Sequence, residues 1–90
     1  MRFEWDEDKR RSNIAKHGID FVDALEVFDG RHRLDFESPR GGEQRILSVA
    51  QLGERIIAVA WAWRGEEMVR VISVRRARHE EERGYLQLYG

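Results

Sequence analysis

The sequence predicts an α+β domain in which a small antiparallel meander sheet packs with two N-terminal helices and one C-terminal helix. Helix-capping residues and helical spacing of apolar residues occur in residues 6–30, and a helical pattern returns in residues 77–88. Between them, residues 31–74 carry alternating or continuous apolar runs separated by turn signals, as strands do. Helices segregated from a run of consecutive strands are typical of the α+β class.

The first thirty residues predict one short strand and two helices. Residues 2–5 alternate polar and apolar, which favours a strand. Asp6 is a suitable N-cap for a surface helix that ends at about residue 17, before Gly18. Asp20 caps a second helix, which ends at Gly30. The apolar residues of this second helix recur at the spacing of a core-facing stripe: Phe21, Ala24, Leu25 and Phe28.

The rest of the chain predicts four strands and a last helix. A weak strand covers residues 32–36, and the Ser-Pro-Arg-Gly-Gly run that begins at Ser38 is the clearest turn signal. Three stronger strands, joined by short glycine-containing turns, cover residues 44–52, 55–63 and 68–74. The last helix covers residues 77–88, and Leu86 and Tyr89 are its expected anchors.

Composition limits the functions open to the chain. Its 90 residues predict a single domain, residues 1–90, with a formal net charge of −1. A chain so near neutrality is not a polybasic nucleic-acid binder that acts through bulk charge. The absence of cysteine excludes disulfides, a thiol nucleophile and a cysteine zinc site, and no spacing of metal ligands is present. With no long apolar run and a polar N-terminal segment, we expect no membrane span, no signal peptide and a cytoplasmic location.

Arginine is the most informative residue type in the sequence. It outnumbers lysine by 14 to 2, and its guanidinium fork suits phosphate and carboxylate groups. Six arginines fall in one twenty-residue stretch: Arg64, Arg70, Arg75, Arg76, Arg78 and Arg83. Strand alternation predicts Arg70 and Arg76 on one face and Arg75 on the other. Because an unpaired arginine is costly in an apolar strand, Arg70 is expected to pair with Glu43 or Glu67, or to hold an anionic ligand.

Two further pairs of residues each admit a structural and a functional interpretation. His17, beside Lys16 at a predicted helix C-terminus, either stabilises the helix dipole or offers a titratable group for acid–base chemistry. Trp61 and Trp63 are expected on one face of the central strand, where they either pack in the core or stack a nucleic-acid base.

Two blocks of sequence carry a resemblance to a known family. The first block contains Trp5, Asp6, Lys9, Asn13, Lys16, His17, Gly18, Phe21, Ala24 and Phe28. The second block contains Arg64-Gly65, the run from Arg70 to Ala77, Glu82-Arg83 and Tyr85. In this order and separation they resemble the opening and closing signatures of the BrnT-type toxins, and the resemblance spans nearly the whole chain.

The resemblance implies a cytoplasmic ribonuclease toxin with a RelE-like fold, from a bacterial type II toxin–antitoxin pair. Such a toxin would cut RNA without a metal ion or other cofactor. It implies a ribbon–helix–helix antitoxin as partner, in a heterotetramer of two toxins and two antitoxins that contacts operator DNA only through the antitoxin.

The residues of the implied site follow from the same resemblance. Its catalytic set contains Arg64, Arg70, Arg75, Arg76, Lys16 and His17. The arginines would hold the scissile phosphate, while the lysine and histidine would transfer protons or position the substrate. The substrate-binding residues would be Lys9, Asn13, Trp61 and Glu82, and Glu82 would orient an arginine. The alternative is a non-catalytic module whose arginine strand binds an acidic protein segment or a nucleic acid.

Overall fold

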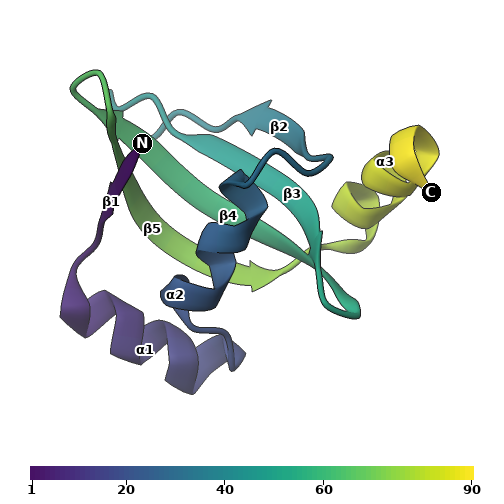
Figure 1. The fold of residues 1–90 in the computed structure, drawn as a ribbon, viewed down its shortest axis with the longest axis horizontal. Coiled ribbons are helices and arrows are strands. Elements are labelled where there is room, and N and C mark those ends of the chain that lie inside the picture. The colour runs from purple at the N-terminus through teal and green to yellow at the C-terminus, as the bar shows by residue number, and fades with distance from the viewer.

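The computed structural model of the chain describes all residues from 1 to 90 and has the predicted α+β architecture (Figure 1). Its strands are β1 (Arg2–Glu4), β2 (Leu34–Glu37), β3 (Ile46–Leu52), β4 (Arg55–Arg64) and β5 (Met68–Arg76). Its helices are α1 (Glu7–His17), α2 (Phe21–Ala24), the 3₁₀ helix η1 (Leu25–Phe28) and α3 (His79–Tyr89). No helix has both the length and the apolar character that a membrane crossing requires.

The five strands form one sheet in the order β1-β5-β4-β3-β2. Strands β2 to β5 are the predicted antiparallel meander. The sheet differs from the prediction at one edge, where β1 pairs with β5 in parallel and aligns Glu4 with Arg70. This pairing joins segments more than sixty residues apart, so no local pattern in the sequence could have indicated it.

The predicted ends of the first helix are confirmed. The Asp6 side chain accepts hydrogen bonds from the backbone N–H groups of Asp8 and Lys9, at 2.9 and 3.3 Å. At the other end, Gly18 has a φ of 68°, and its N–H donates to the carbonyl of Ile14. Left-handed φ values favour glycine, which is why the helix ends here.

The second helix differs from the prediction after its first turn. Asp20 caps it as expected, but the α-helix ends at Ala24 and continues as the 3₁₀ helix η1. Phe21 and Ala24 of α2 are fully buried, and because a 3₁₀ helix has three residues per turn, η1 buries Val27 on the same face. Phe28, expected in the core-facing stripe, is only half-buried.

The helices divide the two sides of the sheet between them. The larger core lies on the face of the sheet that α2 and η1 cover, where they pack against β4 and β5 (Figure 1). We call this the helix-covered face, although α3 covers one end of the other face. The buried strand residues of this face include Ile57, Val59, Trp61, Val69, Val71 and Val74. The smaller core lies on the opposite face, where α3 covers one end of the sheet. The remainder of that opposite face has no helix over it.

The anchor of α3 is Tyr85 rather than the predicted Leu86 and Tyr89. Tyr85 is buried against Val49 and Ala58, whereas Leu86 and Tyr89 are 45% and 40% exposed. Gly84 allows this close packing, because a Cβ atom there would lie 3.3 Å from the Leu34 side chain. The glycine that lowers helix propensity thus lets the helix approach the sheet.

Candidate active site

An irregularity in β5 decides which arginines share a face of the sheet. Ser73 pairs with Ala60 and Val71 pairs with Trp61, so Ile72 has no partner in β4. An extra, unpaired residue in one strand of an antiparallel pair is a β-bulge. Beyond it, the side chains of that strand point to the opposite faces of the sheet from those that strict alternation predicts.

The bulge corrects the predicted placement of the arginines. Val71 and Val74 both face the larger core, so Arg70 and Arg75 both point to the opposite side of the sheet. Arg76 is on the helix-covered side, not beside Arg70 as predicted. We call the side that carries Arg45, Arg64, Arg70 and Arg75 the arginine face. Arg70 and Arg75 lie four register steps apart, which is roughly 13 Å along the sheet.

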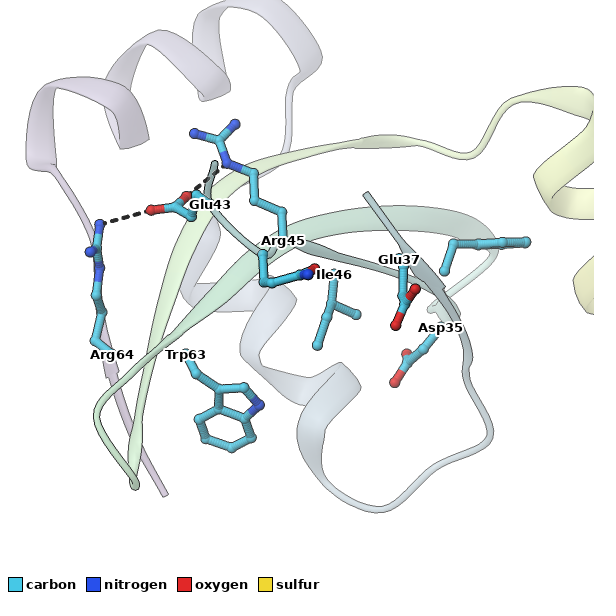
Figure 2. A pocket seen from close by; sticks show the side chains of 9 residues that line it. Asp35, Glu37, Glu43, Arg45, Ile46, Trp63 and Arg64 are labelled. Atoms are coloured by element: carbon cyan, nitrogen blue, oxygen red, sulfur yellow. Dashed lines mark hydrogen bonds and ion pairs between the residues drawn. The ribbon is translucent and has the colours of Figure 1, made fainter. Parts of the chain in front are cut away.

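The Glu43 carboxylate is the centre of one half of the arginine face. It accepts from Arg45 Nε at 2.8 Å and lies 3.3 Å from Arg64 Nη2 (Figure 2). The hydrogen bond from Arg45 lowers the pKa of Glu43, and the positive charges of Arg64 and Arg70 lower it further. Two guanidinium groups therefore contact a single ionised carboxylate, and the charge of a third acts on it.

A tight hairpin brings Glu43 to this position. Arg40 and Glu43 exchange backbone hydrogen bonds of 3.0 and 2.8 Å across Gly41-Gly42. Both glycines have positive φ values, as a two-residue hairpin turn of this kind requires. The turn predicted from Ser38 onward is confirmed, and it positions Glu43 beside the sheet.

Arg70 pairs with a residue that the sequence analysis did not consider. Its Nη1 donates to Glu4 at 2.8 Å, a contact that follows from the alignment of β1 beside β5. Neither Glu43 nor Glu67 makes this ion pair, although the charge of Arg70 acts on Glu43. The remaining N–H groups of the Arg70 guanidinium have no protein acceptor.

The other half of the arginine face is a hollow of about 410 Å³ beside the N-terminus of α3. Its polar lining consists of Ser38, Arg40, Arg45, Ser73, Arg75, Arg78 and Glu81. Arg75 donates two hydrogen bonds to Glu81, at 2.8 and 2.9 Å, which lowers the pKa of Glu81 and raises that of Arg75. Arg40 and Arg78 make no ion pair within 4 Å.

The whole surface is positive although the chain is not. It gathers six arginines (Arg40, Arg45, Arg64, Arg70, Arg75 and Arg78) and three glutamates (Glu4, Glu43 and Glu81). Its net charge is +3, against −1 for the entire chain. Such an arrangement can bind a polyanion, polarise a phosphoryl group and offer an ionised carboxylate as a proton acceptor.

The structure does not bring the implied residues of α1 to this surface. Lys9, Lys16 and His17 are exposed and line neither of the hollows that contain Arg45. Asn13 is buried at 6% exposure, and its amide bonds the backbone of Ile19 and Val74. Its side chain therefore holds the fold together and is not open to a substrate.

Three other implied residues lie away from the arginine face. Trp61 is 2% exposed in the larger core, where its Nε1 donates to Ser48, whereas Trp63 is 47% exposed. Arg76 and Glu82 line a separate hollow. The carboxylate that orients an arginine is Glu81, one position before the expected Glu82.

The sequence analysis did not include four residues in the site: Arg40, Glu43, Arg45 and Glu81. Of these, Glu43 was considered only as a partner of Arg70. A signal for two of them was present, because Glu43 and Arg45 are charged residues of one parity directly before β3. The run Arg40 to Arg45 has the pattern of a charged hairpin, and this pattern indicates Glu43 as a partner for Arg64.

Comparison with known proteins identifies the family and the fold. The family model described as "Ribonuclease toxin, BrnT, of type II toxin-antitoxin system" matches residues 5–81. The chain is also similar to the Brucella abortus ribonuclease toxin BrnT, whose crystal structure it matches with a TM-score of 0.71 and 40% sequence identity. This match covers 88% of the present chain and 99% of the Brucella chain. None of the curated protein sequences matches the chain.

Proposed function

The chain belongs to the BrnT family of ribonuclease toxins of type II toxin–antitoxin systems, and we propose that it cuts RNA on the arginine face without a metal ion. The observation that carries the proposal is the pairing of Arg45 and Arg64 with Glu43 on the face that also carries Arg70. Positive charge that is concentrated on one open face attracts the RNA backbone despite the negative net charge of the chain.

The proposed reaction uses the RNA as its own nucleophile. The 2′-oxygen attacks the adjacent phosphorus, its proton passes to a base, and the bond to the 5′-oxygen of the next nucleotide breaks. The products are a 2′,3′-cyclic phosphate and a 5′-hydroxyl, which takes up a proton. Charge grows on the phosphoryl oxygens in the transition state, where preorganised donors are worth most. Arg64 and Arg70 supply these donors.

Glu43 is the proton acceptor in this proposal. Like any glutamate it is ionised at neutral pH, and an ionised carboxylate has acceptor capacity only; its lowered pKa keeps it ionised in mild acid as well. The pair with Arg64 is loose, at 3.3 Å with the arginine side chain 51% exposed, so a phosphate can draw Arg64 away from Glu43. The pair with Arg45 stays short and holds the carboxylate in place.

Arg75 has a different task from that of the first two arginines. Glu81 holds it with two hydrogen bonds in a half-buried position, and the same carboxylate accepts from the Arg78 N–H at the start of α3. Arg75 therefore fixes the helix against the sheet and adds charge beneath the hollow. Arg40 and Arg78, which are free of ion pairs, bind the RNA backbone as it leaves the cut.

The proposed metal independence rests on the arginines as the source of positive charge. The guanidinium groups occupy the position in which a divalent cation would otherwise stabilise the phosphoryl oxygens. Cleavage of a short RNA should therefore continue at an unchanged rate in excess EDTA. Loss of activity that added magnesium restores would contradict this part of the proposal.

The toxin–antitoxin family implies an antitoxin as partner, and we propose that it is a ribbon–helix–helix protein in a two-to-two complex in the cytoplasm. A short neighbouring gene with the ribbon–helix–helix pattern would support the type of antitoxin. The mass of the purified complex, measured by light scattering, tests the stoichiometry.

The decisive experiment compares arginine variants in a cleavage assay with purified chain and no antitoxin. Arg64→Ala and Arg70→Ala should each lower the cleavage rate by roughly 10²–10³-fold, the cost of losing one preorganised donor. Arg11→Ala is the matched control, because Arg11 is 73% exposed on α1 and outside the site. Circular dichroism verifies that each variant is folded. Parental rates in both folded variants would refute the site, and a parental chain that cuts no RNA would refute the function.

A further inference from the structure

Strands β3 and β4 separate at one end of the sheet and leave a hollow of about 460 Å³ (Figure 2). Their last paired residues are Ile46 and Trp61, so the segments before and after them are free to diverge. Arg45 and Arg64 point to one side of the strands in Figure 2, whereas Trp63 and Ile46 point to the other. Both sets of residues line the hollow, which therefore connects the arginine face to Trp63.

Trp63 offers an aromatic surface that is supported from behind. Its ring is 47% exposed and meets Trp61 edge to face, with ring centroids 5.3 Å apart. Trp61 is itself fixed, because it is buried and its Nε1 donates to Ser48 Oγ at 2.8 Å. An exposed tryptophan held by a rigid neighbour is a suitable platform for a flat ring.

Two carboxylates line the same hollow. Asp35 accepts from Ser48 Oγ at 2.6 Å and pairs with Arg33 at 3.3 Å, so its position is fixed. Glu37 is exposed, and no ion pair or side-chain hydrogen bond engages it. Both carboxylates point to the side of the strands that carries Trp63 (Figure 2). Ionised carboxylates only accept hydrogen bonds, so the hollow selects groups that donate them.

We infer that this hollow is a nucleobase subsite, in which the base next to the scissile phosphate stacks on Trp63 and donates hydrogen bonds to Glu37. The inference rests on the proposed function, since the phosphate would be held by Arg64, the residue directly after Trp63 in β4. The anionic backbone stays with the arginines, and only the uncharged base approaches the carboxylates.

The chemistry of the hollow favours guanine. The Watson–Crick edge of guanine carries two adjacent donors, its ring N–H and its amino group, which one carboxylate can accept together. Uracil presents a single N–H between two carbonyl oxygens, and a carboxylate repels those oxygens. Discrimination by such contacts commonly amounts to 1–3 kcal/mol, which is roughly 5–150-fold. We therefore expect cleavage next to guanine to be faster than cleavage next to uracil.

The test uses two short RNAs that differ only in guanine or uracil beside one cleavable phosphate. The parental chain should cut the guanine substrate with a kcat/KM that is roughly 5–150-fold higher, the range given above. Trp63→Ala should lower kcat/KM on the guanine substrate by roughly 5–150-fold, the range of base stacking on an aromatic ring, whereas Trp63→Phe should keep most of it. Glu37→Gln should bring the guanine-to-uracil ratio close to one.

The control for the carboxylate is Glu66→Gln, an exposed glutamate in the β4–β5 turn that does not line the hollow. It should keep the parental ratio. A parental kcat/KM in Trp63→Ala together with a parental ratio in Glu37→Gln would overturn the subsite and leave the proposed function standing. So would a Trp63→Ala chain that cuts RNA normally but escapes its antitoxin, because the hollow would then be a protein-docking site. A parental chain that cuts neither RNA would refute the proposed function itself.

Discussion

Replacing Asn13 by alanine should destabilise the fold severely while leaving the arginine face intact. The Asn13 Nδ2 group donates to the carbonyls of Ile19 and Val74, at 3.0 and 2.8 Å, and Oδ1 accepts from the Val74 N–H at 3.0 Å. Strand β1 pairs with β5 only as far as Arg70, so the amide of Asn13 serves Val74 as a neighbouring strand would. Alanine at this position removes all three hydrogen bonds.

The size of the effect follows from those three bonds. Each contributes about 1 kcal/mol net, so the free energy of unfolding should fall by about 3 kcal/mol. A domain of this size loses roughly 4–8 °C in Tm per kcal/mol, which gives a decrease of roughly 12–24 °C. That is a large part of the roughly 5–15 kcal/mol that stabilises a typical domain.

Thermal unfolding followed by circular dichroism measures the decrease, and Ser12→Ala is the control because Ser12 is exposed on the same helix. At a temperature where Asn13→Ala is still folded, it should cut RNA at close to the parental rate. A variant that melts like the parent but no longer cuts RNA would refute the structural role. Asn13 would then be the substrate-binding residue that the family resemblance implies.

Three further predictions concern charge. His17→Ala should change the cleavage rate by less than about twofold, because His17 is outside both hollows of the arginine face, and a loss of more than about tenfold would place α1 in the site. The lowered pKa of Glu43 predicts a cleavage rate that shows no histidine-like inflection near neutral pH and falls only when the pH drops below the ordinary glutamate value of 4.5. The Glu43→Gln variant should lose this fall. An inflection near neutral pH would exclude Glu43 as the base. Glu81→Gln should lower Tm at pH 7, because a carboxylate whose pKa is lowered by Arg75 stabilises the fold above 4.5, and this contribution disappears as the pH falls through the lowered value. The Tm difference from the parent should therefore shrink in acid, and a difference that persists there would indicate lost packing.

The predictions that are confirmed rest on short stretches of sequence. The caps at Asp6 and Gly18, the glycine turns and the approximate spans of the strands are each set by residues within a few positions of one another. Arg64 and Arg70, which the family resemblance implies as phosphate-binding residues, both lie on one open face, and their role stays a prediction. Local capping and turn geometry therefore establish where the elements lie.

The predictions that differ from the structure depend on contacts between distant segments. The function of Asn13 depends on Val74, sixty-one positions away, and the partner of Arg70 is Glu4 in a strand that pairs in parallel. Glu81 rather than Glu82 orients an arginine because the start of α3 directs that side chain at Arg75.

The α+β class, the order of the elements and the supply of arginines could be predicted from the sequence, since these depend on composition and on spacing along the chain. Which arginines share a face could not be predicted, because it depends on the register of the folded sheet. The unpaired Ile72 shifts the pairing of β5 by one residue, and because side chains alternate with a period of two, that single step moves Arg75 to the face of Arg70 and Arg76 away from it. Register between strands is set by packing of the complete sheet, which no single segment of the chain encodes.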